Sequence, residues 1–246
     1  MTPATHRGPG RSRRIGHNII KPGSGLAELT DRLAGASWDM VELDVLSLGS
    51  ELVIAHDASD LEHPVPIPFE RALEALCEHL PATVELNVDV KSTGYERQVV
   101  DVLRSLQLIE RTLISTMELE SLPVLRAAAP ELRIGWSVPK ARHNYLAHPL
   151  TRPAAYVMLA YLRRVLPRQT TRVLESGVAD AIMAHWGVVT PTLWAGIQSL
   201  GKELYVWTVD DPDRLVTLDT LGVTGVITND RTLFERAGFD SAGRRG

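Results

Sequence analysis

The sequence has one cysteine and no long hydrophobic run, and each absence excludes a class of protein. The single thiol, Cys77, excludes an internal disulfide and is compatible with a reducing compartment. No segment approaches the roughly 20 apolar residues that cross a bilayer. The basic N-terminus lacks the apolar stretch of a signal peptide. We therefore expect a cytoplasmic protein without stable membrane insertion.

The sequence also lacks an excess of charge of one sign. Its 26 Lys and Arg residues nearly balance 30 Asp and Glu residues, which leaves a net charge of −4. This balance argues against a nucleic-acid-binding protein. Glycine-rich phosphate loops of the G-x-G-x-x-G or Walker type are absent after every predicted strand, which argues against a nucleotide-binding fold. The composition does not define an oligomeric state.

Strand-like and helix-like patterns alternate along the whole chain. Regular alternation of this kind predicts a parallel sheet, and about eight units in 246 residues favour a closed barrel. We therefore expect an α/β fold, a single-domain (β/α)8 TIM barrel. The expected barrel strands cover residues 14–17, 41–45, 83–92, 112–116, 132–138, 179–185, 203–209 and 225–228, and residues 52–56 pair with the second of them. The expected helices cover residues 26–33, 69–80, 95–106, 119–128, 154–166, 191–200, 212–221 and a last one from 231.

The ends of the chain are polar and set the expected domain limits. We expect a disordered arm over residues 1–13, the barrel domain over 14–238 and a polar tail over 239–246. Cys77 lies on a predicted helix beside a leucine stripe, so we expect a buried thiol that serves packing rather than chemistry.

Two of the predicted strands carry carboxylates where a barrel usually has aliphatic side chains. Glu42 and Asp44 alternate with three aliphatic residues, so both acids face the same side of their strand. Asp89 and Lys91 alternate in the same way in the next barrel strand. Neighbouring carboxylates repel each other, and a bound cation is the usual remedy. A solvated strand face is the simpler alternative.

Active sites of (β/α)8 barrels lie at the carboxyl ends of the strands, where these polar groups converge. Three carboxylates form a site for a hard cation such as Mg²⁺ or Ca²⁺ rather than zinc. Histidines such as His17 and His56 supply a general base and a general acid near neutral pH, and Lys91 supplies a charge for phosphate. Together these groups predict metal-dependent cleavage of a phosphodiester. His185 ends a further predicted strand, and Trp207 lies within the next one. A hydrogen bond to the backbone is the simpler interpretation for His185, and packing is the simpler interpretation for Trp207.

Six short motifs, in order along most of the chain, resemble the glycerophosphodiester phosphodiesterase family. They are IGH (15–17), VELDV (41–45), HD (56–57), LNVDVK (86–91), YVWTVDDPDRL (205–215) and GVTGVITND (222–230). The resemblance implies a phosphoric diester hydrolase of lipid metabolism that hydrolyses a glycerophosphodiester, or a related small phosphodiester, to a phosphomonoester and an alcohol. Position by position, it implies that Glu42, Asp44 and Asp89 hold the metal, that His17 and His56 form the acid–base pair, and that Lys91 and Trp207 line the substrate site.

The sequence departs from the family pattern at the first motif. The family usually has His-Arg-Gly, whereas Asn18 follows His17 here, so a neutral amide stands where an arginine would grip the phosphate. A literal His-Arg-Gly occurs at residues 6–8, but without a preceding strand. We expect Asn18 and His185 to contribute to substrate binding.

These departures keep two alternatives open beside hydrolysis. The first is a lyase similar to the sphingomyelinase D-like toxins, which releases a cyclic phosphate. The second is a barrel that binds its ligand without catalysis, which the lost arginine motivates and the retained histidines and carboxylates oppose.

Overall fold

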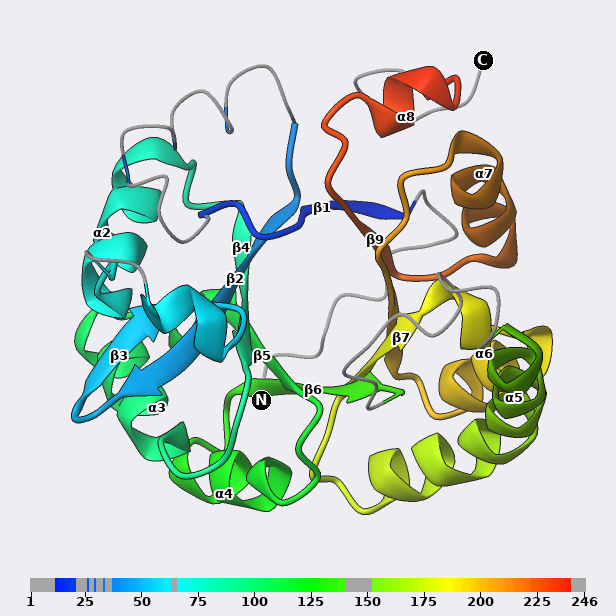
Figure 1. Cartoon of the computed structure of the whole chain (residues 1–246), viewed down its shortest axis with the longest axis horizontal. Helices are drawn as coiled ribbons and strands as arrows, with labels where there is room; N and C mark the ends of the chain where they lie inside the picture. Colours follow the sequence, from blue (N-terminus) through cyan, green and yellow to red (C-terminus); the bar gives the residue numbers. More distant parts are fainter. Residues whose placement is uncertain are drawn as a thin grey trace.

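A computed structural model describes residues 12–20, 37–62, 66–139 and 152–239, together with residues 26, 29 and 33. Eight parallel strands close into a barrel because β1 pairs with both β9 and β2 (Figure 1). This closure confirms the predicted (β/α)8 barrel. The barrel strands are β1 (Arg13–Gly16), β2 (Met40–Leu48), β4 (Glu85–Val90), β5 (Thr112–Thr116), β6 (Arg133–Val138), β7 (Ala181–His185), β8 (Glu203–Trp207) and β9 (Gly225–Thr228).

One additional strand lies outside the barrel. β3 (Glu51–Ile54) runs antiparallel to the end of β2, with Val45 opposite Ile54. This hairpin confirms the predicted pairing of residues 52–56 with the acidic strand. It also brings the segment after β3 back to the carboxyl end of the barrel, where His56 follows it.

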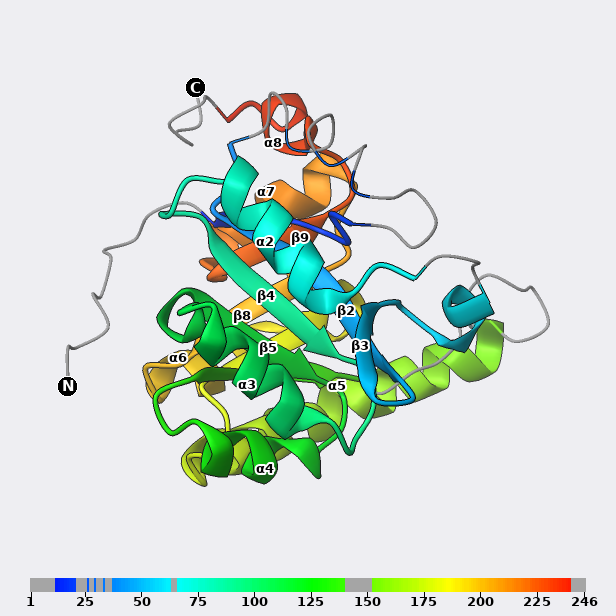
Figure 2. The same ribbon diagram turned by 90° about the vertical axis from the view of Figure 1, so that its left-hand side faces the viewer.

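Helices lie outside the strands, as Figure 2 shows for α2, α3 and α4 beside β4 and β5. Where helices were predicted in the described chain, their positions agree within a few residues except for α5, which continues through Pro167 for almost three turns beyond the predicted end. The α-helices are α2 (Phe69–His79), α3 (Glu96–Ser105), α4 (Ser121–Ala128), α5 (Arg152–Glu175), α6 (Pro191–Ser199), α7 (Pro212–Leu221) and α8 (Leu233–Arg236). Short 3₁₀ turns are η2 (Ala58–Glu62), η3 (Ile109–Arg111) and η4 (Trp186–Val188).

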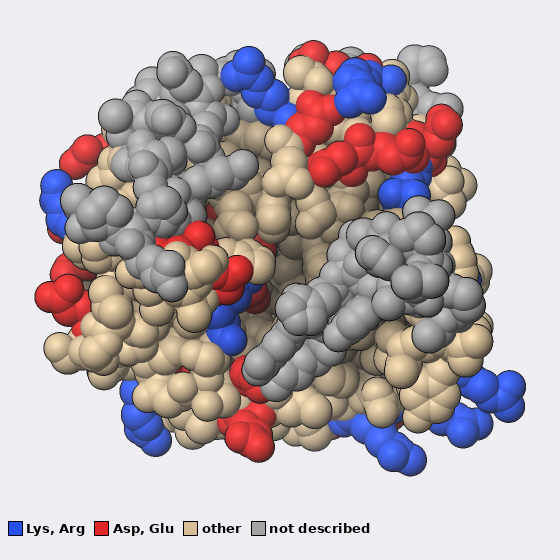
Figure 3. Space-filling view, viewed as in Figure 1, with Lys and Arg blue, Asp and Glu red and all other residues tan. Residues whose placement is uncertain are grey.

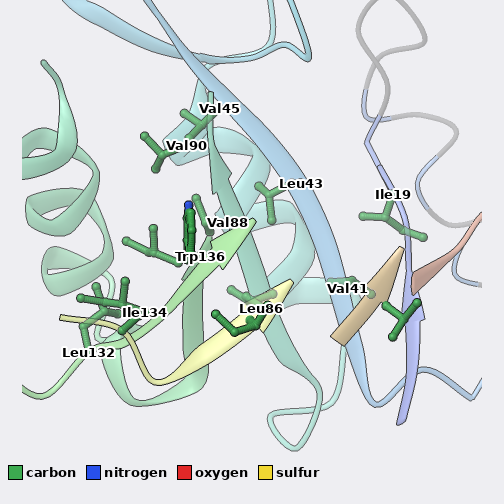
Figure 4. Packing of buried hydrophobic residues seen from close by; sticks show 14 of the residues in the cluster. Ile19, Val41, Leu43, Val45, Leu86, Val88, Val90, Leu132, Ile134 and Trp136 are labelled. Atoms are coloured by element: carbon green, nitrogen blue, oxygen red, sulfur yellow. The ribbon is translucent and has the colours of Figure 1, made fainter. Parts of the chain in front are cut away.

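Strand alternation produces two separate apolar layers. Aliphatic residues of β2 and β4 such as Val41, Leu43 and Val88 point outward and pack beneath the helices (Figure 4). A smaller cluster fills the barrel interior and includes Met40, Leu113 and other residues of the inward faces. The remaining inward positions of the barrel strands carry polar side chains, and these side chains form the site.

The amino-terminal end of the barrel is closed by a charged cluster rather than by a site. Glu85 accepts hydrogen bonds from Arg13 and Arg133, and Arg133 also pairs with Glu203. The Tyr205 hydroxyl contacts both arginines. The cluster joins β1, β4, β6 and β8, so it ties together strands that are distant in the sequence.

Three expectations differ from the structure at the level of single residues. Cys77 is exposed on α2 rather than buried, because it lies one position beyond the buried Leu76 and faces away from the barrel. The barrel begins at Arg13 instead of residue 14, and the Ser12 N–H already donates to Asp219. Phe239, placed in the polar tail, is buried against Phe234.

Most of the helix predicted over residues 26–33 lies outside the described residues, as do the arm over residues 1–11 and the tail beyond residue 239. Within the described chain, the helices are all too short or too polar to cross a membrane.

Candidate active site

Three carboxylates meet at the carboxyl ends of β2 and β4. The register places Asp44 opposite Asp89 and Glu42 opposite Asn87, so these side chains lie on the same inward face. One oxygen from each of Glu42, Asp44 and Asp89 lies within 4.8 Å of the others, and all three residues are buried. The structure therefore brings together the three residues predicted as metal ligands.

Burial makes the negative charge of this cluster costly. It raises the pKa of Glu42 to about 7, with a smaller opposing effect from His17. Burial also raises the pKa of Asp44, although the neighbouring Lys91 acts against this rise. A bound cation would offset the cost of ionising these acids.

Lys91 supplies positive charge within the cluster. Its Nζ lies 2.8 Å from an Asp44 oxygen and 2.6 Å from an Asp89 oxygen. Burial alone would lower the pKa of Lys91, but the surrounding carboxylates raise it, so the ammonium stays charged. The other Asp89 oxygen accepts a 2.6 Å hydrogen bond from Ser115.

The donor set fits a hard divalent cation. All three candidate ligands are carboxylates, the groups that Mg²⁺ and Ca²⁺ prefer. A buried oxygen of Glu42 has no hydrogen-bond partner among the residues that the structure describes. Lys91 already neutralises part of the charge of Asp44 and Asp89, so a cation would share these two carboxylates with the ammonium.

His17 is held in a defined orientation at the end of β1. Its Nδ1 lies 2.8 Å from Oδ1 of Asn229, and the Asn229 side-chain amide donates to Asp210. Because a carboxylate only accepts, this contact turns the Asn229 oxygen toward His17, and Nδ1 carries the ring proton. The opposite nitrogen, Nε2, is then unprotonated and can accept a proton. It lies 3.6 Å from Oε2 of Glu42.

His56 lies on the other side of the site and is more open. Its side chain is 55% exposed, compared with 23% for His17, and its Nδ1 lies 3.8 Å from a carboxylate oxygen of Asp57. Its backbone N–H donates to Asp60, which fixes the main chain after β3.

Both histidines line one cavity of about 160 Å³ at this end of the barrel. In the view down the barrel, Figure 3 shows a hollow near the centre with acidic and basic side chains beside it. The described lining residues are His17, Glu42, His56, Asp89, Lys91, Ser115, Met117, Ser137, Met183, Trp207, Thr208 and Ile227. The cavity is large enough for a small phosphodiester headgroup.

The residues expected to contact substrate separate into two groups. Lys91 and Trp207 line the cavity, and the Trp207 indole N–H is fixed by a hydrogen bond to the Met183 carbonyl. His185 and Asn18 are not among the described lining residues. His185 accepts a hydrogen bond from the Gly187 N–H and packs its ring against Trp207, while Asn18 adopts a left-handed backbone conformation with φ of 45°.

Sequence reasoning missed four polar residues around the site. Ser115 and Ser137 line the cavity, but serine within an apolar strand carries no distinctive signal. Asp210 and Asn229 support His17 from two different loops. Both lie inside the C-terminal motifs noted in the sequence, so only their role was missed.

The fold and the site together describe one class of protein, a (β/α)8 barrel with carboxylates and histidines clustered at the carboxyl ends of its strands. The profile of the Glycerophosphoryl diester phosphodiesterase family matches residues 61–232. The chain therefore belongs to this family of phosphoric diester hydrolases.

Two curated relatives carry related names. The chain is 26% identical over 211 residues to "Probable glycerophosphodiester phosphodiesterase 2" of Mycobacterium tuberculosis, a match that covers 85% of this chain and 67% of the relative. It is 30% identical over 97 residues to glycerophosphodiester phosphodiesterase GDPD4 of Arabidopsis thaliana, which covers 39% of this chain and 30% of the plant protein. The chain thus spans less than a third of the plant relative.

Solved structures share the fold at low sequence identity. A glycerophosphodiester phosphodiesterase from Parabacteroides distasonis superposes with a TM-score of 0.66 at 16% identity, covering 94% of this chain and all of the other. An Oleispira antarctica phosphodiesterase, solved in complex with its product sn-glycerol-3-phosphate, superposes with a TM-score of 0.64 at 19% identity, covering 92% and 96% of the two chains.

Proposed function

We propose that the protein is a metal-dependent phosphodiesterase that hydrolyses a glycerophosphodiester, or a related small phosphodiester, to a phosphomonoester and an alcohol. The observation that carries the proposal is one cavity lined by two histidines and by Glu42 and Asp89, two of the three clustered carboxylates; an oxygen of the third, Asp44, lies within 4.8 Å of theirs. Family membership supports the reaction class. The product bound by the Oleispira antarctica protein supports a glycerol phosphate unit in the substrate.

The charged groups of the site bind and orient the phosphate. A divalent cation, Mg²⁺ or Ca²⁺, held by Glu42, Asp44 and Asp89 would neutralise the non-bridging oxygens and the charge that develops during attack. Lys91 adds a positive charge that Asp44 and Asp89 hold in place. Trp207 supplies an apolar wall beside the phosphate site.

The first chemical step places the two histidines in complementary roles. A hydroxyl of the glycerol unit attacks phosphorus, and its proton moves to Nε2 of His17, which the contact with Asn229 leaves unprotonated. The bond from phosphorus to the leaving alkoxide breaks, and His56 supplies the proton that forms the alcohol. The product of this step is a cyclic phosphodiester.

The second step reverses the roles. Water gives a proton to His56 and attacks the cyclic phosphorus, while protonated His17 returns its proton to the departing glycerol oxygen. The sum is one water consumed and one monoester and one alcohol formed. If the cyclic product left before water attacked, the protein would instead act as a lyase.

Phosphorus NMR distinguishes these outcomes directly. The purified protein is incubated with glycerophosphodiesters and lysophospholipids in the presence of Mg²⁺ or Ca²⁺, with EDTA and His17→Ala samples in parallel. A new monoester signal that both controls lack supports hydrolysis. A lasting cyclic-phosphate signal assigns the lyase reaction, and unchanged spectra with every substrate and metal refute the proposed activity.

A further inference from the structure

The side-chain amide of Asn87 is a buried polar group that the proposed mechanism does not use. This residue lies on the inward face of β4, two positions before Asp89, and is fully buried. Apolar residues including Met40 and Leu113 fill the interior at this level. Neither polar atom of the Asn87 amide has a hydrogen-bond partner within the described chain. A buried amide without a hydrogen-bond partner destabilises the fold. We therefore expect Asn87 to have a function that offsets this cost.

The neighbouring strand carries a complementary unpartnered atom. Register pairs Asn87 with Glu42 across β2 and β4, and inward side chains at paired positions lie next to each other. Oxygen Oε2 of Glu42 is buried and, among the described residues, has no hydrogen-bond donor; Nε2 of His17 lies 3.6 Å from it. An amide that can donate and a carboxylate that can accept therefore face the same small volume.

The other two carboxylates of the cluster show what Glu42 lacks. Asp89 is held by Lys91 and Ser115, and Asp44 is held by Lys91. Ligand carboxylates in metal sites are ordinarily oriented by such outer hydrogen bonds, which keep one oxygen directed at the ion. Among the described residues, Oε2 of Glu42 has no such hydrogen bond. The second oxygen of Asp44 has no partner in the described chain either, but Asp44 keeps its 2.8 Å ion pair with Lys91.

We infer that Asn87 is the positioning residue for Glu42: its amide donates to a water that in turn donates to the buried carboxylate oxygen, and this bridge holds the other oxygen toward the bound cation. This inference rests on the proposed metal-dependent function. Asn87 does not contact substrate in this arrangement, so it acts through Glu42 alone. The Asn87 amide reduces the stability of the metal-free barrel because its oxygen is buried among apolar side chains. It raises the affinity for the metal because it orients Glu42.

Calorimetric titration of the full chain with Mg²⁺ and with Ca²⁺ tests the inference. Asn87→Leu has nearly the same volume but no donor, and we expect its metal dissociation constant to rise about tenfold or more. Asn87→Ser retains a donor and should bind metal more tightly than Asn87→Leu. Thr112→Val is the matched control, because Thr112 is equally buried on the adjacent strand but donates to the Leu108 carbonyl. It should leave the dissociation constant unchanged.

Thermal unfolding in EDTA supplies a second reading that a purely structural role would not produce. We expect Asn87→Leu to raise the metal-free midpoint by roughly 2–4 °C, and Thr112→Val to lower it. Metal affinity of Asn87→Leu within twofold of wild type would overturn the inference while leaving the proposed function intact. Absence of metal binding by the wild-type protein would instead refute the proposed function.

Discussion

At the scale of single residues, the burial of Glu42 determines how the site responds to pH. Its pKa in the folded protein is about 7, above the ordinary value of 4.5. Between these two values the folded state holds a proton that the unfolded state has lost. The stability of the metal-free protein therefore falls as pH rises from about 4.5 to 7, and the loss persists above pH 7.

Glu42→Gln removes this titration, so we expect the variant to be more stable than wild type at pH 8 in EDTA. The difference should reach up to about 3 kcal/mol, since each pKa unit corresponds to about 1.4 kcal/mol. It should vanish near pH 4. Urea unfolding at both pH values measures it, with Glu85→Gln as a control of opposite sign. Equal stability of Glu42→Gln and wild type at pH 8 would contradict the claim that the buried, ionised Glu42 carboxylate destabilises the metal-free protein.

The contact between His17 and Asn229 gives a second prediction at this scale. Asn229→Leu removes the acceptor for Nδ1, so the imidazole loses its fixed tautomer and orientation. We expect kcat to fall roughly 10²-fold with KM little changed, because general acid–base catalysis contributes at least that much. Steady-state kinetics measures both constants. A rise in KM at constant kcat would show that Asn229 binds substrate instead.

Sequence reasoning located the charged residues of the site but not their supports. Glu42, Asp44 and Asp89 were recognisable because carboxylates interrupt aliphatic strands. Ser115 was not assigned a role, because one polar residue in a strand is compatible with many environments. Asn87 was expected in a polar interior layer of the barrel, and it is fully buried there. His185 shows the opposite limit: its strand-end position suggested substrate contact, whereas only the packed structure reveals its partner at Gly187.

At the scale of elements, the pairing of β2 with β4 creates the site. One register brings Glu42, Asp44 and Asp89 to the same inward face, and a one-residue slip of β2 against β4 would turn Glu42 and Asp44 away from the face that carries Asp89. The charged cluster at the amino-terminal end of the barrel positions β4 relative to two other strands, since Glu85 of β4 binds Arg13 of β1 and Arg133 of β6.

Loss of this cluster should affect stability without affecting the chemistry. Glu85→Ala leaves two partly buried guanidinium groups without their shared carboxylate, and we expect unfolding free energy to fall by roughly 2–3 kcal/mol. The Glu85 pKa is lowered: burial acts to raise it, but Arg133 and Arg13 outweigh that effect. Its stabilisation is therefore present above pH 4.5 and is lost as pH falls. A decrease in kcat with intact stability would contradict this separation.

Element boundaries were predictable where hydrophobic periodicity was strong. α7 was predicted with its observed bounds because Asp211 and Gly222 mark its ends chemically. α5 was underestimated because Pro167 suggested a break, yet the helix continues through it. The prediction that Cys77 is buried was wrong, because consecutive residues on a helix point in directions about 100° apart. Cys77 therefore does not share the buried face of Leu76.

At the scale of the whole molecule, closure of the barrel brings residues from distant sequence motifs together in one site. His17 and Asn229 are 212 residues apart in the sequence, but β1 and β9 are adjacent because the sheet closes. The fold was predictable because eight strand–helix units have few stable arrangements. The distances within the site were not, because they depend on how each strand is packed against its neighbours.

The central claim is that the clustered carboxylates and the two histidines form one metal-dependent hydrolytic centre. The most direct test measures turnover of a glycerophosphodiester by the EDTA-treated protein as Mg²⁺ or Ca²⁺ is restored, for wild type and Asp89→Asn. We expect activity to return with metal in wild type and to remain at least roughly 10²-fold lower in the variant. Full activity in EDTA, or equal activity of Asp89→Asn with metal, would contradict the account.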